Sequence, residues 1–330
     1  MFNKLLERQI RRNLRGMTDI PEEFQKIFSA ISDSYNHYES DRTLLERSLD
    51  LSSQELTSAN SKIRDAYELI EQKAKDITDS IAYAQRIQQA MLPTDEFIQK
   101  KLPDSFVLLK PKDVVSGDFY WVADQNGKVY FAACDCTGHG VPGAFMSMIG
   151  ASLLNEVVND KGISQPSQIF YEVRKGFINA LKQHQNTDQK DGMDAVMCSW
   201  DKNGKLEVAA AYSPLYLIRK GELIEIKPDL QPVGYHQGDS EISTCWVSRY
   251  THHEIELEKG DTVYLFTDGY KDQFGGSRGK KFKAVRLKKY LLSIQEFTME
   301  EQKQMLNDRI ESWKGEDEQI DDILAMGVRF

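Results

Sequence analysis

The sequence predicts an α+β fold with two central antiparallel sheets flanked by helices, an αββα sandwich, which follows a long helical segment. Strand-like segments occur in pairs joined by Asn126-Gly127 and Asn203-Gly204, and both dipeptides favour tight hairpin turns. Helical segments are grouped in blocks, so the strand–helix alternation of a doubly wound fold is missing. Residues 1–92 hold one glycine, Gly16, and one proline, Pro21, which indicates a long helical region.

The helical region carries an apolar residue at every seventh position over much of its length. These residues are Leu49, Leu56, Ile63, Ile70, Ile77, Ala84 and Met91. A sustained sevenfold repeat with charged flanks is typical of a coiled coil, and we expect a parallel homodimer. The polar residues Asn60 and Gln88 fall on the same seam, where they lower stability while fixing the register. The alternative is a helical hairpin that bends at Gly16 or at Ser52-Ser53.

Pro93 ends the helical region, because proline cannot continue the backbone hydrogen bonding of a helix. We therefore divide the chain into residues 1–79, a helical coiled-coil segment for dimerisation and signalling, residues 80–93, a linker helix, and residues 94–330, the sandwich domain. The expected strands cover residues 106–109, 119–122, 128–134, 195–200, 206–209, 215–218, 223–226, 262–266 and 323–330. The expected helices of this domain cover residues 144–158, 166–181, 283–292 and 299–313.

Composition limits the classes of partner and the location. The chain has 330 residues, of which 40% are hydrophobic, and this is enough to bury a full core. Its net charge of −9 and pI of about 5.3 disfavour nucleic acid and anionic membranes as partners. No apolar run approaches the roughly 20 residues of a membrane span. The charged N-terminus lacks the apolar centre of a secretion signal, so we expect a cytoplasmic protein without membrane insertion.

The cysteines and one basic run have simple interpretations. The four cysteines Cys134, Cys136, Cys198 and Cys245 lack the spacing of a zinc site, and we expect reduced thiols. Cys134 and Cys136 are two residues apart on one strand and therefore point to the same side of it. The basic run at residues 280–289 is either the solvated face of a helix or a site for an anion or an acidic partner.

Acidic residues stand at turns and strand ends throughout the expected domain. They are Asp118, Asp135, Asp268 and the pair Asp321-Asp322. Asp135, which follows a strand and precedes a glycine-rich turn, is by itself most simply a turn or helix-cap residue. If these acids converge, they repel one another unless cations neutralise them. A ligand set of oxygens alone favours hard ions such as Mg²⁺ or Mn²⁺.

The acidic motifs occur in a characteristic order. They are Val115-Ser116-Gly117-Asp118-Phe119-Tyr120, Asp135-Cys136-Thr137-Gly138-His139-Gly140-Val141-Pro142-Gly143, Phe266-Thr267-Asp268-Gly269 and Asp321-Asp322-Ile323. With these motifs the chain resembles the SpoIIE/RsbU branch of the PPM (protein phosphatase 2C-like) metal-dependent serine/threonine phosphatases. The likeness covers residues 87–330, and residues 89–93 are similar to the linker helix that enters such domains.

The resemblance implies two Mn²⁺ or Mg²⁺ ions between the sheets. The implied ligands are Asp118, Asp135, the backbone carbonyl of Cys136, Asp268 and Asp321. Asp135 would bridge both ions, Asp118 would act largely through water, and Asp322 is the alternative to its neighbour Asp321. Two such ions lower the pKa of a bridging water, which then attacks phosphorus without a phosphoenzyme.

Further residues near these motifs are candidates for the same site. His139 is either the acid that protonates the leaving oxygen or a turn histidine bonded to the backbone. Lys110 and Lys112 are expected within reach of the phosphate. Asp194, in the segment from Asp191 to Asp194, resembles a residue of a further, weaker metal site in some relatives, or it caps the next strand.

Two positions depart from the family pattern, since Cys136 stands where many relatives have glycine and Leu324 where threonine is usual. Neither change removes a ligand. The glycines at residues 138–143 are expected to leave room for a phosphorylated side chain.

The resemblance implies a metal-dependent protein serine/threonine phosphatase that is regulated through its N-terminal helices. The implied substrate is a phosphorylated regulatory protein, such as a STAS-type anti-sigma-factor antagonist. The alternative is a catalytically silent coiled-coil signalling scaffold with a phosphatase-like binding domain. A nucleotide cyclase would need a nucleotide site, and the sequence has no glycine-rich P-loop.

Overall fold

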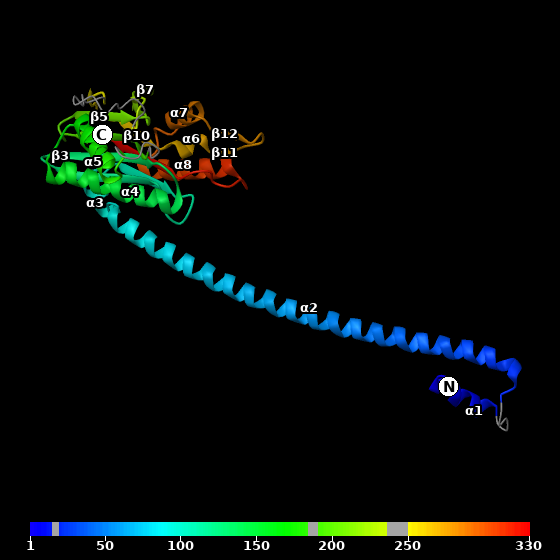
Figure 1. Cartoon of the computed structure of the whole chain (residues 1–330). Helices are drawn as coiled ribbons and strands as arrows, with labels where there is room; N and C mark the ends of the chain where they lie inside the picture. The colour runs from blue at the N-terminus through cyan, green and yellow to red at the C-terminus, as the bar shows by residue number, and fades with distance from the viewer. Residues whose placement is uncertain (15–19, 184–190, 236–249) are drawn as a thin grey trace. The chain divides into compact units, whose positions relative to one another are not determined.

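Figure 1 shows the computed structural model of the chain, which describes residues 1–14, 20–183, 191–235 and 250–330. The described chain forms two compact units, Met1–Ile77 and Thr78–Phe330. The helix α2 (Glu22–Met91) begins in the first unit and ends in the second.

In the first unit the short helix α1 (Lys4–Asn13) folds back on the first turns of α2. The backbone N–H of Asn3 donates to Ser32 Oγ at 2.7 Å, and Asn3 Nδ2 donates to Asn36 Oδ1 at 2.8 Å. The Asn3 side chain also accepts from the N–H of Leu5, which caps α1. One polar residue therefore both begins α1 and holds it against α2.

The helix α2 is continuous through Ser52 and Ser53, so the alternative of a hairpin that bends at these residues is wrong. The other predicted bend, Gly16, lies outside the described residues. The chain thus contains a short α1–α2 hairpin at its start, and the sevenfold apolar residues lie beyond it on α2.

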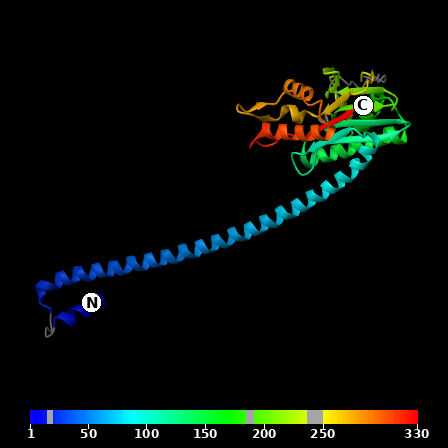
Figure 2. The same cartoon turned by 180° about the vertical axis from the view of Figure 1, so that it is seen from behind.

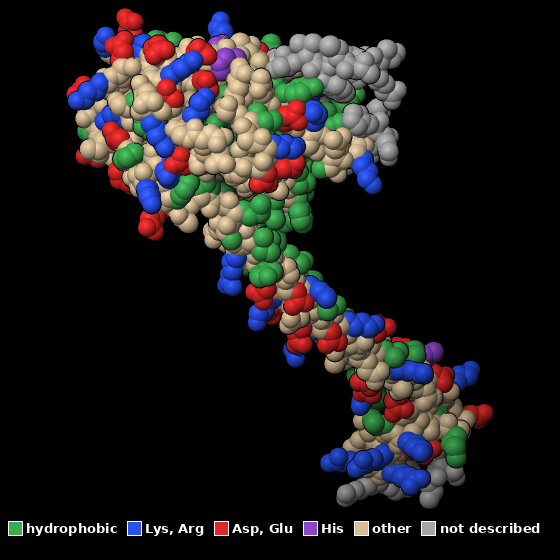
Figure 3. All heavy atoms as spheres, turned by 90° about the vertical axis from the view of Figure 1, so that its left-hand side faces the viewer, with side chains coloured by type: hydrophobic (Ala, Val, Ile, Leu, Met, Phe, Trp, Pro, Cys, Tyr) green, Lys and Arg blue, Asp and Glu red, His purple; other side chains and the backbone are tan. Residues whose placement is uncertain are grey.

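These sevenfold residues are exposed in the single chain. Leu49, Leu56, Ile63, Ile70 and Ile77 are between 54% and 66% exposed. Charged side chains of both signs are interspersed along α2 on the face shown in Figure 3. In proteins most helical stability comes from packing of an apolar face rather than from propensity, and apolar residues in a regular row favour a partner. The dimer stays a prediction.

The second unit contains two antiparallel sheets. The first sheet consists, in spatial order, of β1 (Ser105–Lys110), β13 (Ile323–Arg329), β10 (Thr262–Phe266), β6 (Leu215–Arg219) and β7 (Glu222–Ile226). The second sheet consists of β2 (Asp118–Gln125), β3 (Lys128–Cys136), β4 (Gly192–Trp200), β5 (Lys205–Ala211) and β9 (His253–Glu256), with β8 (Val233–Gly234) beside β4. Two short strands, β11 (Phe274–Gly275) and β12 (Lys280–Lys281), form a separate hairpin.

Helices cover the outer faces of both sheets. The second sheet is covered by α4 (Gly140–Asn155), the π-helical turn η1 (Glu156–Asp160) and α5 (Pro166–Ala180), and the first sheet by α7 (Ala284–Ser293) and α8 (Met299–Lys314). The layers can be followed in Figure 1 and from behind in Figure 2. This arrangement confirms the predicted α+β sandwich. The short helices α3 (Asp95–Lys101) and α6 (Asp268–Asp272) and the strand β9 were not expected from the sequence.

The side chains of β3 point alternately to the two faces of the sheet, so this strand contributes to two cores. Val129, Phe131 and Ala133 lie in the core between the sheets, whereas Tyr130, Ala132 and Cys134 lie under α4 and α5. Each fully buried large apolar side chain contributes about 1.5–3 kcal/mol to folding. The same parity places Asp135 on the inner side, at the end of β3 where the core between the sheets stops.

The prediction for the two neighbouring cysteines is confirmed, because Cys134 and Cys136 share the core under the helices. Burial raises the pKa of both thiols well above the ordinary value, so neither is a thiolate near neutral pH. Cys245 lies outside the described residues.

One helical stretch requires a correction to the sequence analysis. Gly140–Asp160 has the length and apolar composition of a membrane span, although no such run was expected. Half of its apolar window is buried, and α4 packs against β2, β3 and α5. Packing in the core under the second sheet therefore accounts for its apolar character.

The basic run at residues 280–289 is not one helix face. Lys280 and Lys281 lie in β12, Lys283 has a φ of 73°, and residues 284–289 belong to α7. Lys288 Nζ is 2.8 Å from Glu225 Oε2, and Lys281 Nζ is 3.3 Å from Asp272 Oδ1. These lysines are therefore paired on the surface of the unit.

Candidate metal centre

Three acidic residues form a row across the second sheet. Asp118 on β2 pairs directly with Asp135 on β3, and Asp135 pairs directly with Asp194 on β4. Like charges at directly opposite positions destabilise a sheet. Asp194 lies inside β4, so the prediction that it only caps a strand is wrong. The register of three strands, rather than their sequences, brings it beside Asp135.

The first sheet adds two further acids to this row. Asp268 is the first residue of α6 and follows β10, and Asp321 precedes β13. The strands β10 and β13 are antiparallel neighbours with Phe266 opposite Ala325, so the end of one strand and the start of the other meet at one edge. The structure therefore brings together the four acids that the sequence singled out, Asp118, Asp135, Asp268 and Asp321, with Asp194 beside them.

Burial and mutual repulsion raise the pKa values of these carboxyls. Burial, with the nearby charge of Asp135, holds the pKa of Asp118 well above its ordinary value. Burial, with the charge of Asp268, raises the pKa of Asp135 to about 8 and that of Asp194 to about 7. Burial and Asp268 also raise the pKa of Asp321. Ionising these carboxyls together is therefore unfavourable in the folded chain, and a bound cation would relieve their repulsion.

The donor set fits hard divalent ions. The converging side chains offer carboxylate oxygens, and oxygen-only sites select Mg²⁺ or Mn²⁺ over ions that prefer nitrogen or sulfur. The Cys136 thiol is buried on the helix side of β3, so only the backbone carbonyl of this residue can take part. The predicted ligand types are therefore compatible with the geometry.

The structure distinguishes the two residues of the Asp321-Asp322 pair. Asp322 is 2% exposed, and its two oxygens accept from the backbone N–H groups of Lys112 and Gly117, both at 2.7 Å. Asp321 is partly exposed, and its Oδ1 accepts from the N–H of Asp322 at 2.9 Å. Asp322 thus fastens the loop before Asp118, whereas Asp321 faces the other acids.

Thr267 was missed in the sequence and links the two sheets at the centre. Its hydroxyl donates to Asp118 Oδ2 at 2.6 Å and accepts from the N–H of Leu324 at 2.9 Å. The residue is 3% exposed. Its place directly before Asp268, after a strand, is the signal from which its position could have been inferred.

Three glycines allow close contact between the two turns of the site. A side chain at Gly117 or Gly143 would collide with the carbonyl oxygen of Gly138, and a Cβ at Gly143 would also lie 2.9 Å from Gly117 Cα. Gly138 itself has a φ of 88°. We predicted that the glycines of this turn leave room for a phosphorylated side chain; the observed reason for Gly143 is backbone packing.

His139 lies in an exposed row with two charged neighbours. Its Nδ1 is 3.0 Å from Asp113 Oδ2, and its Nε2 is 3.3 Å from Lys112 Nζ. Asp113 was not singled out in the sequence. Lys112 lies near enough to Asp321 to oppose the rise of its pKa.

Lys110 does not reach this region. Its Nζ lies 2.7 Å from Glu311 Oε1 and 2.8 Å from Asn307 Oδ1, both on α8. The expectation that Lys110 contacts the phosphate is therefore wrong.

The end of α2 contacts the loop that carries Asp118. Gln88 Nε2 donates to the carbonyl of Ser116 at 2.6 Å and to Ser147 Oγ at 2.9 Å, and its Oε1 accepts from the N–H of Ser116 at 3.1 Å. Gln88 is 8% exposed. It was expected on the coiled-coil seam, and that expectation is wrong because its side chain is buried in the second unit. Met91 likewise packs against the core under α4.

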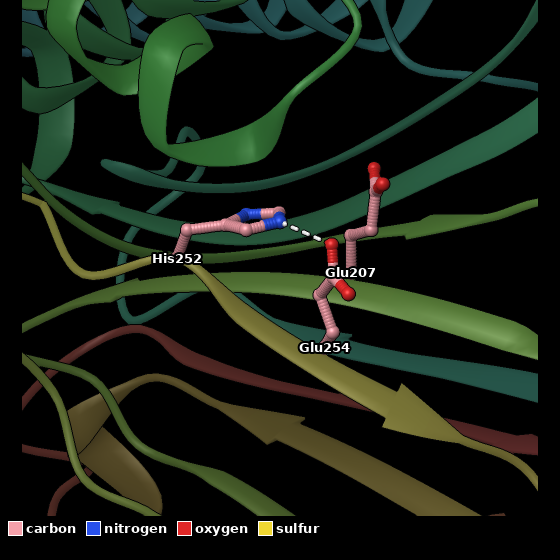
Figure 4. A group of neighbouring side chains, drawn as sticks. All are labelled: Glu207, His252 and Glu254. Atoms are coloured by element: carbon pink, nitrogen blue, oxygen red, sulfur yellow. Dashed lines mark hydrogen bonds and ion pairs between the residues drawn. The ribbon is translucent and has the colours of Figure 1, made fainter.

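A second group of potential ligands lies on the second sheet, away from these acids. Figure 4 shows Glu207, His252 and Glu254, whose ligand atoms lie within 4.8 Å of one another. Lys128 Nζ is 2.7 Å from Glu207, and Lys205 Nζ is 2.9 Å from Glu254. His252 Nε2 is 3.1 Å from Glu254. Because lysines already neutralise both glutamates, this group does not need a metal.

Comparison with known proteins identifies the family. Residues 125–330 match the family described as Stage II sporulation protein E (SpoIIE). The phosphoserine phosphatase RsbU of Bacillus subtilis (strain 168) is 27% identical over 197 residues, which cover 59% of this chain and 54% of that protein. The chain therefore spans about half the length of this curated relative.

Solved structures share the fold. The SiaA-PP2C domain of Pseudomonas aeruginosa is 32% identical with a TM-score of 0.68, and the match covers 78% of this chain and 98% of that one. The phosphatase domain of SpoIIE from Bacillus subtilis, solved with a fragment of its regulatory domain, is 17% identical with a TM-score of 0.52 and matches over 69% of this chain and 63% of that one. At that identity the second likeness shows the fold alone.

Proposed function

The chain belongs to the SpoIIE family, and on this premise we propose that it is a metal-dependent protein serine/threonine phosphatase. The observation that carries the proposal is the convergence of Asp118 and Asp135 from one sheet with Asp268 and Asp321 from the other. Oxygen donors at raised pKa, gathered at one edge, are what a site for divalent cations requires.

We propose two Mn²⁺ or Mg²⁺ ions at this site, held by Asp118, Asp135, the carbonyl of Cys136, Asp268 and Asp321. When bound, such ions supply an activated water and stabilise charge on the phosphoryl oxygens. Asp322 and Thr267 keep the ligands in place, because Asp322 accepts from the N–H of Gly117 and Thr267 donates to Asp118. These positioning bonds come from the first sheet and act on the second.

Two residues beside the acids are suited to the substrate. Lys112 is a cation at the margin of the acidic site, and a phosphoryl oxygen would be attracted to it. His139 is held through Nδ1 by Asp113, which leaves Nε2 on the side of Lys112. In the proposed reaction the imidazolium form of His139, in which Nε2 carries a proton and no longer accepts from Lys112, gives that proton to the leaving serine or threonine oxygen.

The proposed substrate is a phosphorylated regulatory protein of the STAS type. The phosphoserine phosphatase named among the relatives supports the phosphoserine part of this proposal. The STAS class rests on the family resemblance of the sequence motifs, and dephosphorylation of a purified phosphorylated STAS protein is its direct test.

We propose that the N-terminal helices dimerise and control the site. The exposed sevenfold residues of α2 supply an apolar row for a second copy. Gln88, near the end of the same helix, bonds to both the N–H and the carbonyl of Ser116, which lies two residues before Asp118. A shift of α2 would therefore move the loop of Asp118. Sedimentation velocity of a variant with Leu56→Asp and Ile63→Asp tests the dimer, and an unchanged mass contradicts it.

Hydrolysis of an aryl phosphate tests the enzymatic proposal. We expect turnover that depends on Mn²⁺ in the full chain and is lost in Asp135→Asn, while the exposed Asp160→Asn retains it. Turnover no greater than that of Asp135→Asn would contradict the proposal and support a silent scaffold.

A further inference from the structure

A cavity of about 240 Å³ opens beside the acidic row on the side of Asp194 and Asp268. Its deeper wall is formed by buried side chains that include Phe266 and Leu287, which are 5% and 1% exposed. Tyr212 and Pro214, in the turn after β5, line it as well. The cavity exceeds the roughly 150 Å³ void that accommodates benzene in an engineered protein, so one large side chain can enter it.

Tyr212 has an unusual backbone conformation at this cavity. Its φ is 54°, and the other described non-glycine residues at positive φ are one asparagine and four lysines. Bulky residues rarely adopt this region, and such strain persists where the surroundings impose it. Tyr212 is also 42% exposed.

One hydrogen bond within the turn and one to a neighbouring segment hold this conformation. The N–H of Tyr212 donates to the carbonyl of Asp229 at 3.0 Å, and the N–H of Ser213 donates to the carbonyl of Ala211 at 2.6 Å. Asp229 is fixed in turn, because its carboxylate accepts from the N–H and the hydroxyl of Thr251, both at 2.7 Å. A strained turn held from outside keeps an aromatic ring at the cavity.

The charges around the cavity select against an acidic occupant. Asp194 and Asp268 line it directly. Lys271 also lines it, but its Nζ lies 3.8 Å from Asp268 and 3.3 Å from Asp272, so its charge is already shared with two carboxylates. An apolar side chain on the aromatic and aliphatic wall meets no such penalty.

We propose that this cavity is a specificity subsite, which receives an apolar side chain adjacent to the phosphoserine of the substrate and in which Tyr212 is the specificity-determining residue. The assignment rests on the proposed phosphatase function, because Asp194 and Asp268 line both the cavity and the acidic site. A phosphoserine at the acids brings its neighbour in the peptide over Tyr212. The subsite thus reads one residue of the substrate rather than the phosphate.

Binding of synthetic peptides to the full chain tests the subsite without turnover. Fluorescein-labelled peptides with a non-hydrolysable phosphonate analogue of phosphoserine, and with Leu, Gly or Glu at each adjacent position, are titrated against the full chain in Mn²⁺ and followed by anisotropy. From the burial of one leucine side chain we expect the Leu peptide to bind about tenfold more tightly than the Gly peptide at one of the two positions.

Substitution of Tyr212 in the full chain tests whether this residue causes the preference for the Leu peptide. Tyr212→Gly and Tyr212→Asn both tolerate positive φ, so they remove the ring without disturbing the turn. We expect both to reduce the Leu-to-Gly ratio to below about threefold, and Tyr212→Phe to retain it. Tyr83→Ala, which removes a tyrosine that is 65% exposed on α2, serves as the matched control and should leave the ratio unchanged.

Two outcomes overturn the proposal. Equal binding of the Leu and Gly peptides shows that the cavity does not read the neighbour, and a preference for Glu assigns the reading to Lys271 instead. Both are measured by binding, whereas a failure of the full chain to hydrolyse aryl phosphate with Mn²⁺ contradicts the proposed function. The two failures are therefore distinguishable.

Discussion

Replacing the central carboxyl should stabilise the metal-free protein and abolish its activity. Asp135 lies between Asp118 and Asp194 in the acidic row, and burial with the charge of Asp268 raises its pKa from 3.8 to about 8. A carboxyl whose pKa is raised on folding stabilises the folded state at low pH, and this stability is lost as pH rises through the folded pKa. Asp135→Asn removes the ionisation without changing the shape of the side chain.

The magnitude follows from the two pKa values. Between pKa 3.8 unfolded and about 8 folded, the carboxyl costs on the order of 4 kcal/mol at pH 7 and roughly 1.5 kcal/mol at pH 5. Part of the gain from Asp135→Asn is lost because the amide that replaces the carboxyl is itself a largely buried polar group that needs hydrogen-bond partners. We expect a net gain of about 2 kcal/mol at pH 8, or roughly 4–8 °C in Tm for a unit of this size.

The assay is thermal unfolding of the full chain in EDTA at pH 5, 6, 7 and 8. The difference in Tm between Asp135→Asn and the parent should grow as the pH rises. In Mn²⁺ the order should reverse, since the parent gains stability from binding and the variant does not.

Asp124→Asn provides a control of opposite sign. The hydrogen bond from Lys101 and the charge of Lys202 hold the pKa of Asp124 below its ordinary value, so this carboxylate stabilises the fold above pH 4. Its replacement should lower Tm at neutral pH. A variant Asp135→Asn that melts below the parent in EDTA at pH 8, or by the same difference at pH 5 and 8, would refute the electrostatic reasoning.

Four further substitutions test the roles of residues that bind the metal or position its ligands. Asp321→Asn should weaken Mn²⁺ binding in calorimetry by at least tenfold with little change in Tm. Asp322→Asn weakens two buried backbone hydrogen bonds and should lower the Tm of the metal-free protein by several degrees. Equal effects of the two substitutions would contradict the distinction between these residues. Gly117→Ala should cost more than 2 kcal/mol in urea unfolding, because its Cβ collides with the Gly138 carbonyl, and a neutral effect would show that the turns separate easily. Gln88→Leu should reduce kcat/KM for aryl phosphate about tenfold while the α2 helicity seen by circular dichroism is kept, and unchanged turnover would disconnect α2 from Asp118.

The layers of the fold could be predicted because hairpin turns and apolar runs are local signals. The residues of β10 were predicted without error, and those of β3 to within two positions, because their strand-forming residues are bounded by turns or glycines. The strand β9 is only four residues long and half exposed, so nothing in its composition marks it as a strand. The five-residue α6 was missed for the same reason.

The acids themselves could be found from the sequence, but their contacts could not. Asp135 and Asp118 stand at strand ends beside glycines, which is a local pattern. Asp194 completes their row only because of the register of β3 with β4, and the residues of these strands do not indicate that register. The roles of Asp322 and Gln88 depend on which backbone groups lie opposite, 205 and 28 residues away in the chain.

The placement of the acids on two sheets also has a consequence for motion. Apolar side chains hold the two sheets together along most of their length, and at the edge with the acids the hydroxyl of Thr267 and the carboxylate of Asp322 are the links described above. A cation held by ligands from both sheets would add a cross-link at an edge where the acidic residues otherwise repel one another. Amide hydrogen exchange should therefore slow at β10 and β13 as well as at β2 and β3 when Mn²⁺ is added, because the metal would join the two sheets at this edge.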